Sequence, residues 1–122
     1  MKINLNLDYK LKPAERRDFP HNKYVTEHLV RTFAVLRYPQ GMNRTDTRTW
    51  SNIMDALDGA IQKDGPDEIE IEKSEFLWIL DVFNWCLDNS KVPPLMASLT
   101  ILFVNYLEKL KTHSETKLEA VK

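Results

Sequence analysis

The stretch DEIEIEKSEFLWILDVFNWCLDN, residues 67–89, changes its hydrophobic period halfway through. Its first part alternates acidic residues with Ile69 and Ile71, which is the period-two pattern of a short strand with one buried face. From residue 73 onward the apolar side chains recur at helical spacing. The change of period predicts a strand at 68–72 that leads directly into a helix at 73–89.

The predicted helix at 73–89 carries two apolar stripes on roughly opposite sides. The expected core stripe comprises Phe76, Ile79, Leu80, Phe83 and Leu87, and the second stripe comprises Trp78, Val82 and Trp85. A helix that is apolar on two sides has to be covered twice. Either this helix is the central element of the domain, or its second stripe meets another molecule.

The rest of the chain contains one more strand pattern and three more helix patterns. Residues 3–11 alternate apolar and polar side chains, and helical spacing recurs at 22–37, 45–63 and 94–111. Because a two-stranded ribbon is too weak to stand alone, we expect the helices to pack on it. The predicted fold is α+β and predominantly helical: about four helices packed with a small two-stranded β ribbon formed by residues 3–11 and 68–72.

The length of 122 residues is that of one domain with a single core. We expect residues 1–111 to form this globular domain. Residues 112–122 lack a sustained apolar pattern and are predicted to be a flexible C-terminal tail. The side chains on the main apolar stripes are predicted to be largely buried: Leu29, Phe33, Leu57, Ile61, Phe76, Leu80, Phe83, Leu99, Leu102 and Tyr106.

The composition favours a reducing, cytoplasmic location away from membranes. The chain has one cysteine, Cys86, so it forms no disulfide within itself. Its amino terminus alternates polar and apolar residues, unlike the apolar core of a signal peptide. The longest apolar stretch, at 94–107, falls short of the roughly 20 residues that a membrane-spanning helix needs.

No motif for catalysis or cofactor binding is present. The three glycines, Gly41, Gly59 and Gly65, fit no phosphate-binding pattern. The three histidines and Cys86 lack metal-ligand spacing. We therefore expect a protein that is not an enzyme, with no catalytic residues, no cofactor and no metal.

Two binding hypotheses follow, and the first is a protein-binding module. Its candidate contact residues are Trp78, Val82 and Trp85, continued by Ile101 and Val104. A contiguous apolar patch is uncommon on a monomer unless an interaction covers it, and tryptophan is enriched among residues that dominate binding energy. The partner is a second copy or another protein, unless the domain itself encloses the stripe.

The alternative is a nucleic-acid-associated protein that uses the basic amino-terminal half. Residues 1–50 hold ten Lys or Arg against five Asp or Glu, whereas residues 51–122 hold seven against thirteen. Basic side chains interleaved with aromatic ones are suited to a phosphate backbone and its bases. The candidate residues are Lys10, Lys12, Arg16, Arg17 and Lys23. Intervening acids and a net charge of −1 disfavour this alternative.

The order of elements resembles a type of small accessory protein encoded by tailed bacteriophages. The resemblance spans residues 1–110 and is carried by "GPDEIEIEKSEF" feeding the third helix and by the proline-led "VPPLMASLTILFVNYL". This chain departs from it in the longer basic connection at 12–22 and in its two tryptophans at 78 and 85. The resemblance implies a non-enzymatic protein in the host cytoplasm that binds and regulates a host or virion protein. It supplies no functional residues.

Overall fold

The residues that the structure describes fold into four α-helices and a two-stranded antiparallel sheet, which confirms the predicted fold class. The structure is a computed structural model that describes residues 1–62 and 64–121, with side chains described as far as Ser114. In chain order the elements are β1 (Lys2–Asn4), the 3-10 turn η1 (Glu15–Arg17), α1 (Asn22–Arg37), α2 (Arg44–Ala60), β2 (Glu68–Glu70), α3 (Lys73–Asp88), the 3-10 turn η2 (Pro94–Met96) and α4 (Ala97–Val121).

The two strands pair as predicted, but the ribbon is shorter. Ile3 lies opposite Ile69 in the antiparallel register, so both side chains face the core. The ladder ends after one further bond, from Leu5 N to Asp67 O, and the Leu5 carbonyl accepts its hydrogen bond from Thr26 of α1. The prediction of a strand through residue 11 is therefore wrong after Asn4.

The remainder of the amino-terminal segment nevertheless buries alternate side chains. Leu5 and Tyr9 are buried although neither is in a strand. Thr26 on α1 takes the place of a strand partner: its hydroxyl donates to Leu5 O at 2.7 Å and lies 2.5 Å from the Tyr9 hydroxyl. The period-two pattern therefore arises from an extended segment that packs on α1 without forming a strand.

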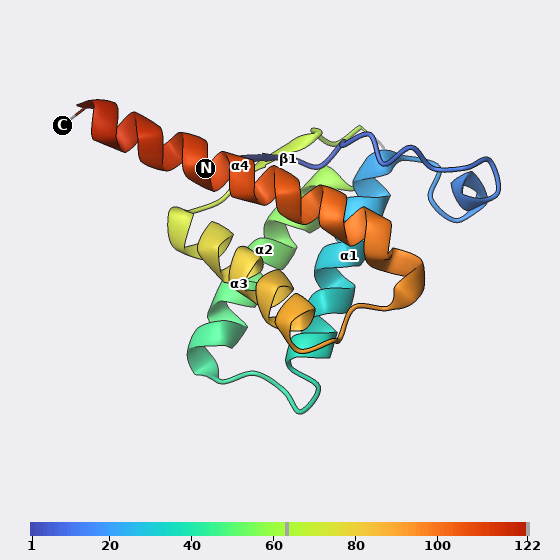
Figure 1. Cartoon of the computed structure of the whole chain (residues 1–122), viewed down its shortest axis with the longest axis horizontal. Coiled ribbons are helices and arrows are strands. Elements are labelled where there is room, and N and C mark those ends of the chain that lie inside the picture. Colours follow the sequence, from blue (N-terminus) through green and yellow to red (C-terminus); the bar gives the residue numbers. More distant parts are fainter. Residues whose placement is uncertain (63, 122) are drawn as a thin grey trace.

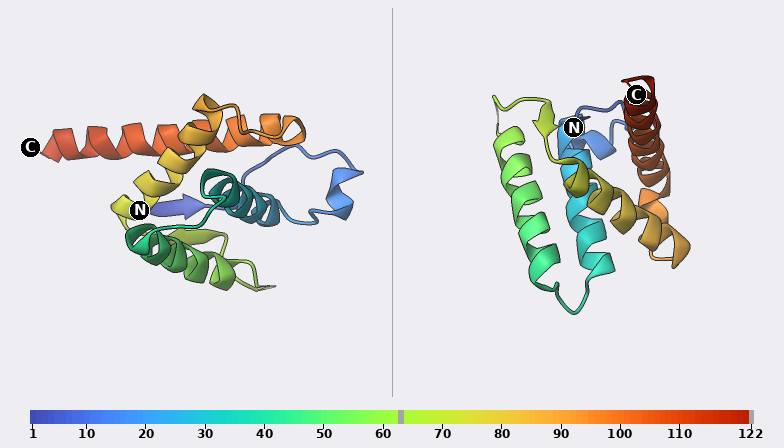
Figure 2. Two further views of the ribbon diagram at one scale, coloured as in Figure 1. Left: turned by 90° about the horizontal axis from the view of Figure 1, so that it is seen from below. Right: turned by 90° about the vertical axis from the view of Figure 1, so that its left-hand side faces the viewer.

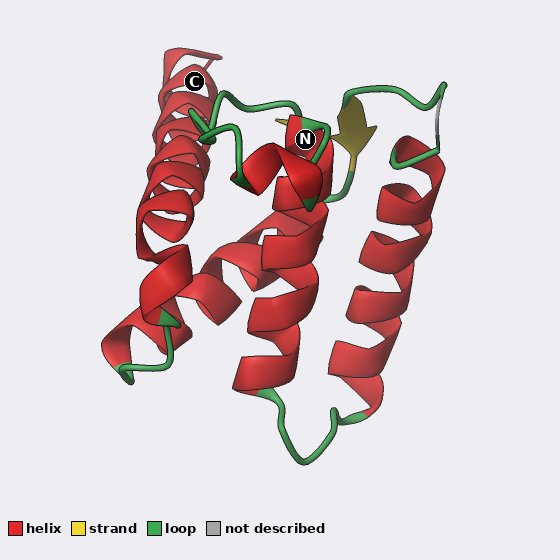
Figure 3. Cartoon of the chain, turned by 90° about the vertical axis from the view of Figure 1, so that its right-hand side faces the viewer, coloured by secondary structure: helices red, strands yellow, loops and turns green. Residues whose placement is uncertain are grey.

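Helix α3 is the central element of the domain. Helices α1 and α2 run side by side in opposite directions and are joined by the loop 38–43 (Figure 3). Helix α3 crosses them, and α4 lies along the far side of α3 (Figure 1, Figure 2). Accordingly, α3 contacts α1, α2 and α4.

The core contains six of the ten side chains predicted to be largely buried. These are Leu29, Phe33, Leu57, Phe76, Leu80 and Phe83. The other four are half-buried: Ile61, and Leu99, Leu102 and Tyr106, which pack against the core. On α4 the fully buried face is instead that of Thr100, Phe103 and Leu107, because the Phe103 ring packs 5.2 Å from that of Phe83.

Helix α4 continues to Val121, so its predicted end at residue 111 is wrong. Its last turns extend beyond the other elements (Figure 1, Figure 2). Residue 122 of the predicted tail lies outside the described residues. The division into a 1–111 domain and a flexible tail stays a prediction.

Candidate functional site

The predicted second stripe does not form one open surface. Val82 and Val104 are buried in the core, with 4% and 6% of their surface exposed. Ile101 is 49% exposed on α4. Only Trp78 and Trp85 combine partial exposure with a recess beside them. Val104 therefore packs inside the monomer, whereas Val82, although buried, still lines the recess beside the two tryptophans, and the shared interface of the five residues stays a prediction.

Trp78 and Trp85 instead form a pocket with the end of α1 and the start of α2. The pocket has a volume of about 290 Å³. It is lined by Arg37, Tyr38, Asp46, Trp78, Asp81, Val82 and Trp85, and we call it the aromatic pocket. Three separate helices and one loop thus bring together side chains that are up to 48 positions apart in the chain.

The rings of the aromatic pocket are held by contacts within the chain. Tyr38 stacks on Trp78 with ring centroids 5.8 Å apart and planes 4° apart. Trp78 Nε1 donates to Asp46 Oδ1 at 3.0 Å, and Trp50 packs behind it with centroids 5.9 Å apart. The Asp46 backbone N–H in turn donates to Asn43 Oδ1, which caps α2. The orientation of Trp78 is therefore set by the start of α2.

Arg37 lies between two of these rings. Its guanidinium carbon is 4.7 Å from the centroid of Tyr38 and 4.4 Å from that of Trp85, both within cation–π range. Among the described residues Arg37 makes no ion pair. Its side chain is therefore oriented by aromatic faces while its N–H donors keep no carboxylate partner.

The Tyr38 hydroxyl stays neutral near physiological pH. Burial raises its pKa, and the negative charge of Asp46 raises it further, against a smaller opposing effect of Arg37. A neutral phenol is both a donor and an acceptor. The pocket therefore offers a phenol, a guanidinium and the Asp81 carboxylate beside apolar ring surface.

A second recess lies at the end of the molecule opposite the carboxyl end of α4. It has a volume of about 560 Å³ and runs between the segment 12–19 and the start of α4. We call it the apolar groove; it is lined by Lys12, Ala14, Glu15, Asp18, Phe19, Val25, His28, Leu29, Leu95, Met96, Ser98 and Leu99. Leu95, at its edge, is 96% exposed.

The basic candidates for nucleic-acid binding do not form one set. Lys23 is buried, and its Nζ donates to the carbonyls of Ala60, Gln62 and Gly65 at 2.8, 3.3 and 3.2 Å. It therefore satisfies the carboxyl end of α2 and is not free for phosphate, so its assignment is wrong. Gly65 is required in this turn because a Cβ there would lie 2.5 Å from Ala60 O.

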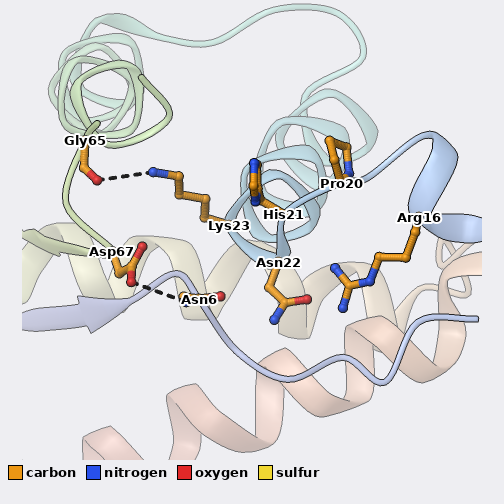
Figure 4. A pocket seen from close by; sticks show the side chains of 8 residues that line it. All are labelled: Asn6, Arg16, Pro20, His21, Asn22, Lys23, Gly65 and Asp67. Atoms are coloured by element: carbon orange, nitrogen blue, oxygen red, sulfur yellow. Dashed lines mark hydrogen bonds between the residues drawn. The ribbon is translucent and has the colours of Figure 1, made fainter. Parts of the chain in front are cut away.

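The remaining basic candidates lie on the connection between β1 and α1. Lys10, Lys12 and Arg17 are exposed, whereas Arg16 is half-buried. Arg16 lines a polar pocket of about 320 Å³ with Asn22 and Lys23 (Figure 4). Asn22 Oδ1 is buried there and has no hydrogen-bond partner among the described residues. This pocket contains both a guanidinium and the carboxylate of Asp67, so its charge selects no ligand.

Sequence reasoning missed Arg37, Tyr38 and Asp46, and it missed Leu95 as an exposed residue. Arg37 and Tyr38 end one helix, and Asp46 starts the next, so none belongs to an apolar stripe. The sequence contained one local signal for these residues. An arginine and a tyrosine are adjacent at the end of one helix, a few positions before the next helix starts. Only the tertiary fold brings that signal against Trp78 and Trp85.

The described residues contain no group of three or more His, Cys, Asp or Glu side chains suited to a metal ion. Within the same residues, none of the helices has the length and hydropathy to cross a membrane. Cys86 is buried, its Sγ lies 3.7 Å from Phe33 O, and burial raises the pKa of its thiol. No protein-family model matches the chain, and neither a curated protein nor a solved structure matches it.

Proposed function

We propose that this chain is a non-enzymatic protein-binding module that docks through the aromatic pocket. The observation that carries the proposal is the composition of that pocket: two tryptophans, a tyrosine and an arginine around one recess. Tryptophan, tyrosine and arginine are the residue types enriched among those that dominate binding energy at protein interfaces.

The rigidity of the pocket supports the same proposal. Trp78 is fixed by its hydrogen bond to Asp46 and by stacking on Tyr38. Side chains already held in one conformation lose little entropy when a partner binds. A partner's side chain that enters this recess can therefore contact the rings without the entropic cost of ordering them.

Arg37 supports a polar contribution to the contact. Its guanidinium lies over two rings and makes no ion pair among the described residues. Such a group is suited to a carboxylate or a backbone carbonyl of a bound protein. The resemblance to phage accessory proteins supports the finer proposal that the partner is a host or virion protein in the cytoplasm.

Affinity capture from the cells that produce the chain tests this function. The wild-type chain is compared with Trp85→Ala and Arg37→Ala, and Tyr24→Ala serves as the control because Tyr24 is a half-buried aromatic outside the pocket. We expect a captured protein that both pocket variants lose and the control retains. Circular dichroism of each variant checks that it is folded.

A salt titration of the captured complex separates protein binding from nucleic-acid binding. Phosphate contacts make the affinity fall steeply with salt, whereas an interface centred on aromatic rings responds much less. Capture that is unchanged in Trp85→Ala and Arg37→Ala would contradict the proposal. Capture that nuclease abolishes, and that Lys10→Ala and Arg17→Ala weaken, would favour the nucleic-acid alternative.

A further inference from the structure

An exposed leucine and the apolar groove lie side by side on one face. Leu95 is 96% exposed, against 67% for Val35 and 49% for Ile101, the other exposed large apolar side chains among the described residues. Single exposed apolar residues need no explanation. Leu95 differs from Val35 and Ile101 because it stands at the edge of a recess with an apolar floor formed by Val25 and Leu29.

The backbone holds Leu95 in one position. Pro93 and Pro94 precede it, and their rings fix φ. The Met96 N–H donates to Pro93 O at 2.9 Å, which closes the turn around Leu95. The backbone of Leu95 is therefore restrained at the start of α4, and its side chain projects from the surface as a knob.

The opposite wall of the groove is also formed without a partner. The Phe19 N–H donates to Glu15 O at 3.0 Å, and the Lys12 N–H donates to the Glu15 carboxylate at 3.0 Å. The Phe19 ring packs on the His28 ring of α1 with centroids 5.3 Å apart. The segment 12–19 is thereby tied to α1, and the groove is present in the isolated chain.

We propose that this face is a homodimer interface in which Leu95 of each copy inserts into the apolar groove of the other. A two-fold interface needs one patch that complements itself, so that residue i meets residue j and j meets i. A knob and a recess side by side on a single chain satisfy that condition, because one rotation brings each knob to the other recess.

The rim of the groove suits the same arrangement. It carries Lys12 together with Glu15 and Asp18. A rim with both signs of charge allows two copies to set unlike charges against each other. The aromatic pocket shares none of these residues, so this inference stands apart from the proposed function.

Sedimentation velocity of the full chain over a concentration series up to about 1 mM, the Kd of a weak complex, tests the inference. We expect concentration-dependent dimerisation of the wild-type chain. Each dimer buries two Leu95 side chains, so Leu95→Lys should weaken dimerisation at least about 100-fold. Val35→Lys places the same charge at another exposed apolar site and should leave dimerisation unchanged, because Val35 lines neither recess.

Two outcomes would overturn the inference. One is a wild-type chain that remains monomeric throughout the series. The other is a dimer that Leu95→Lys and Val35→Lys weaken equally or not at all, which would assign association to a different face. Because Leu95 is exposed, circular dichroism should show that Leu95→Lys keeps the fold.

Cysteine cross-linking tests the reciprocal geometry. Ala14 lies on the groove wall opposite Leu95. In an equimolar mixture of Ala14→Cys and Leu95→Cys chains, oxidation should give mixed disulfide dimers well above the 1:2:1 distribution of random pairing. The native Cys86 is buried and serves as the background. A random 1:2:1 distribution, or a smaller share of mixed dimers, would overturn insertion of Leu95 into the groove.

Discussion

Helices α3 and α4 both carry apolar side chains on more than one side, but the chain covers them differently. Around α3, the core stripe packs on α1 and α4, and Trp78 packs on Tyr38 from the loop after α1 and on Trp50 from α2. Around α4, Phe103 and Leu107 are buried while Ile101 on the same helix is 49% exposed. An apolar side chain is thus covered where neighbouring elements converge on it and stays exposed where they do not.

The comparison is tested most strongly by truncating one side chain on each helix. Phe83 of α3 is buried between Phe33 and Phe103, at ring-centroid distances of 4.5 and 5.2 Å. Phe83→Ala should lower the free energy of unfolding by about 3–5 kcal/mol through lost contacts and a cavity. Ile101→Ala on α4 should change it by less than about 1 kcal/mol. Urea denaturation measures both.

Similar losses for these two variants would mean that α4 is as enclosed as α3. That result would also imply that Ile101 is covered in solution by a contact outside the isolated chain. A loss below about 1 kcal/mol for Phe83→Ala would mean that the core collapses around the missing ring.

The same contrast between enclosed and open side chains applies to the lysines. Lys23 donates to three carbonyls at the end of α2, whereas Lys10 is exposed on the connection before α1. Lys23→Ala should lower the free energy of unfolding by about 1–3 kcal/mol, because it leaves buried carbonyls unpaired. Lys10→Ala should change it by less than about 0.5 kcal/mol. Equal losses of stability in the two variants would indicate that Lys23 is as exposed as Lys10.

Sequence periodicity predicted the fold class because its signal is local. The alternation around Ile3 and Ile69 predicted the pairing of two distant segments, and the helical repeat of Phe76, Leu80 and Phe83 predicted the core face of α3. The length of the ribbon was not predictable in this way. It depends on the contact with α1, where the Thr26 hydroxyl donates to the Leu5 carbonyl at the end of the ladder.

The orientation of α4 and the composition of the pocket depend on contacts between distant elements. Leu99, Leu102 and Tyr106 form a stripe as apolar as the one that is buried, and Thr100 on the buried face reduces the contrast further. Packing of Phe103 on Phe83 decides between the faces. Thr100 is accommodated there because its hydroxyl donates to Met96 O within the helix.

A pH titration tests how completely the amino-terminal segment is buried. Burial raises the pKa of Tyr9 well above its ordinary value, more than its hydrogen bond with Thr26 lowers it. The unfolded chain loses the phenolic proton near pH 10, whereas the folded chain keeps it. The stabilising effect is complete below about pH 10 and falls as pH rises, by roughly 1.4 kcal/mol per pH unit for one such group.

Urea denaturation between pH 9 and pH 11, on the wild-type chain and on Tyr9→Phe, measures this dependence. The variant should start lower by about 1 kcal/mol, because it loses the hydrogen bond to Thr26. It should then lose less stability with rising pH, with Tyr38 and Tyr106 supplying the remaining slope because burial also raises their pKa. Parallel curves would show that Tyr9 is accessible to water.

The smallest expected change in stability comes from shortening α4 at its carboxyl end, and it locates the point beyond which the helix is no longer buried. The last turns of the helix extend past the other elements (Figure 1, Figure 2), whereas Leu107 is fully buried. Ending the chain at Ser114 should therefore change the free energy of unfolding by less than about 0.5 kcal/mol, while the helical circular dichroism signal falls. Ending it at Tyr106 removes Leu107 and should cost about 2–5 kcal/mol. A large loss already at Ser114 would place the enclosed part of α4 beyond the domain boundary at residue 111, and the tail would then belong to the fold.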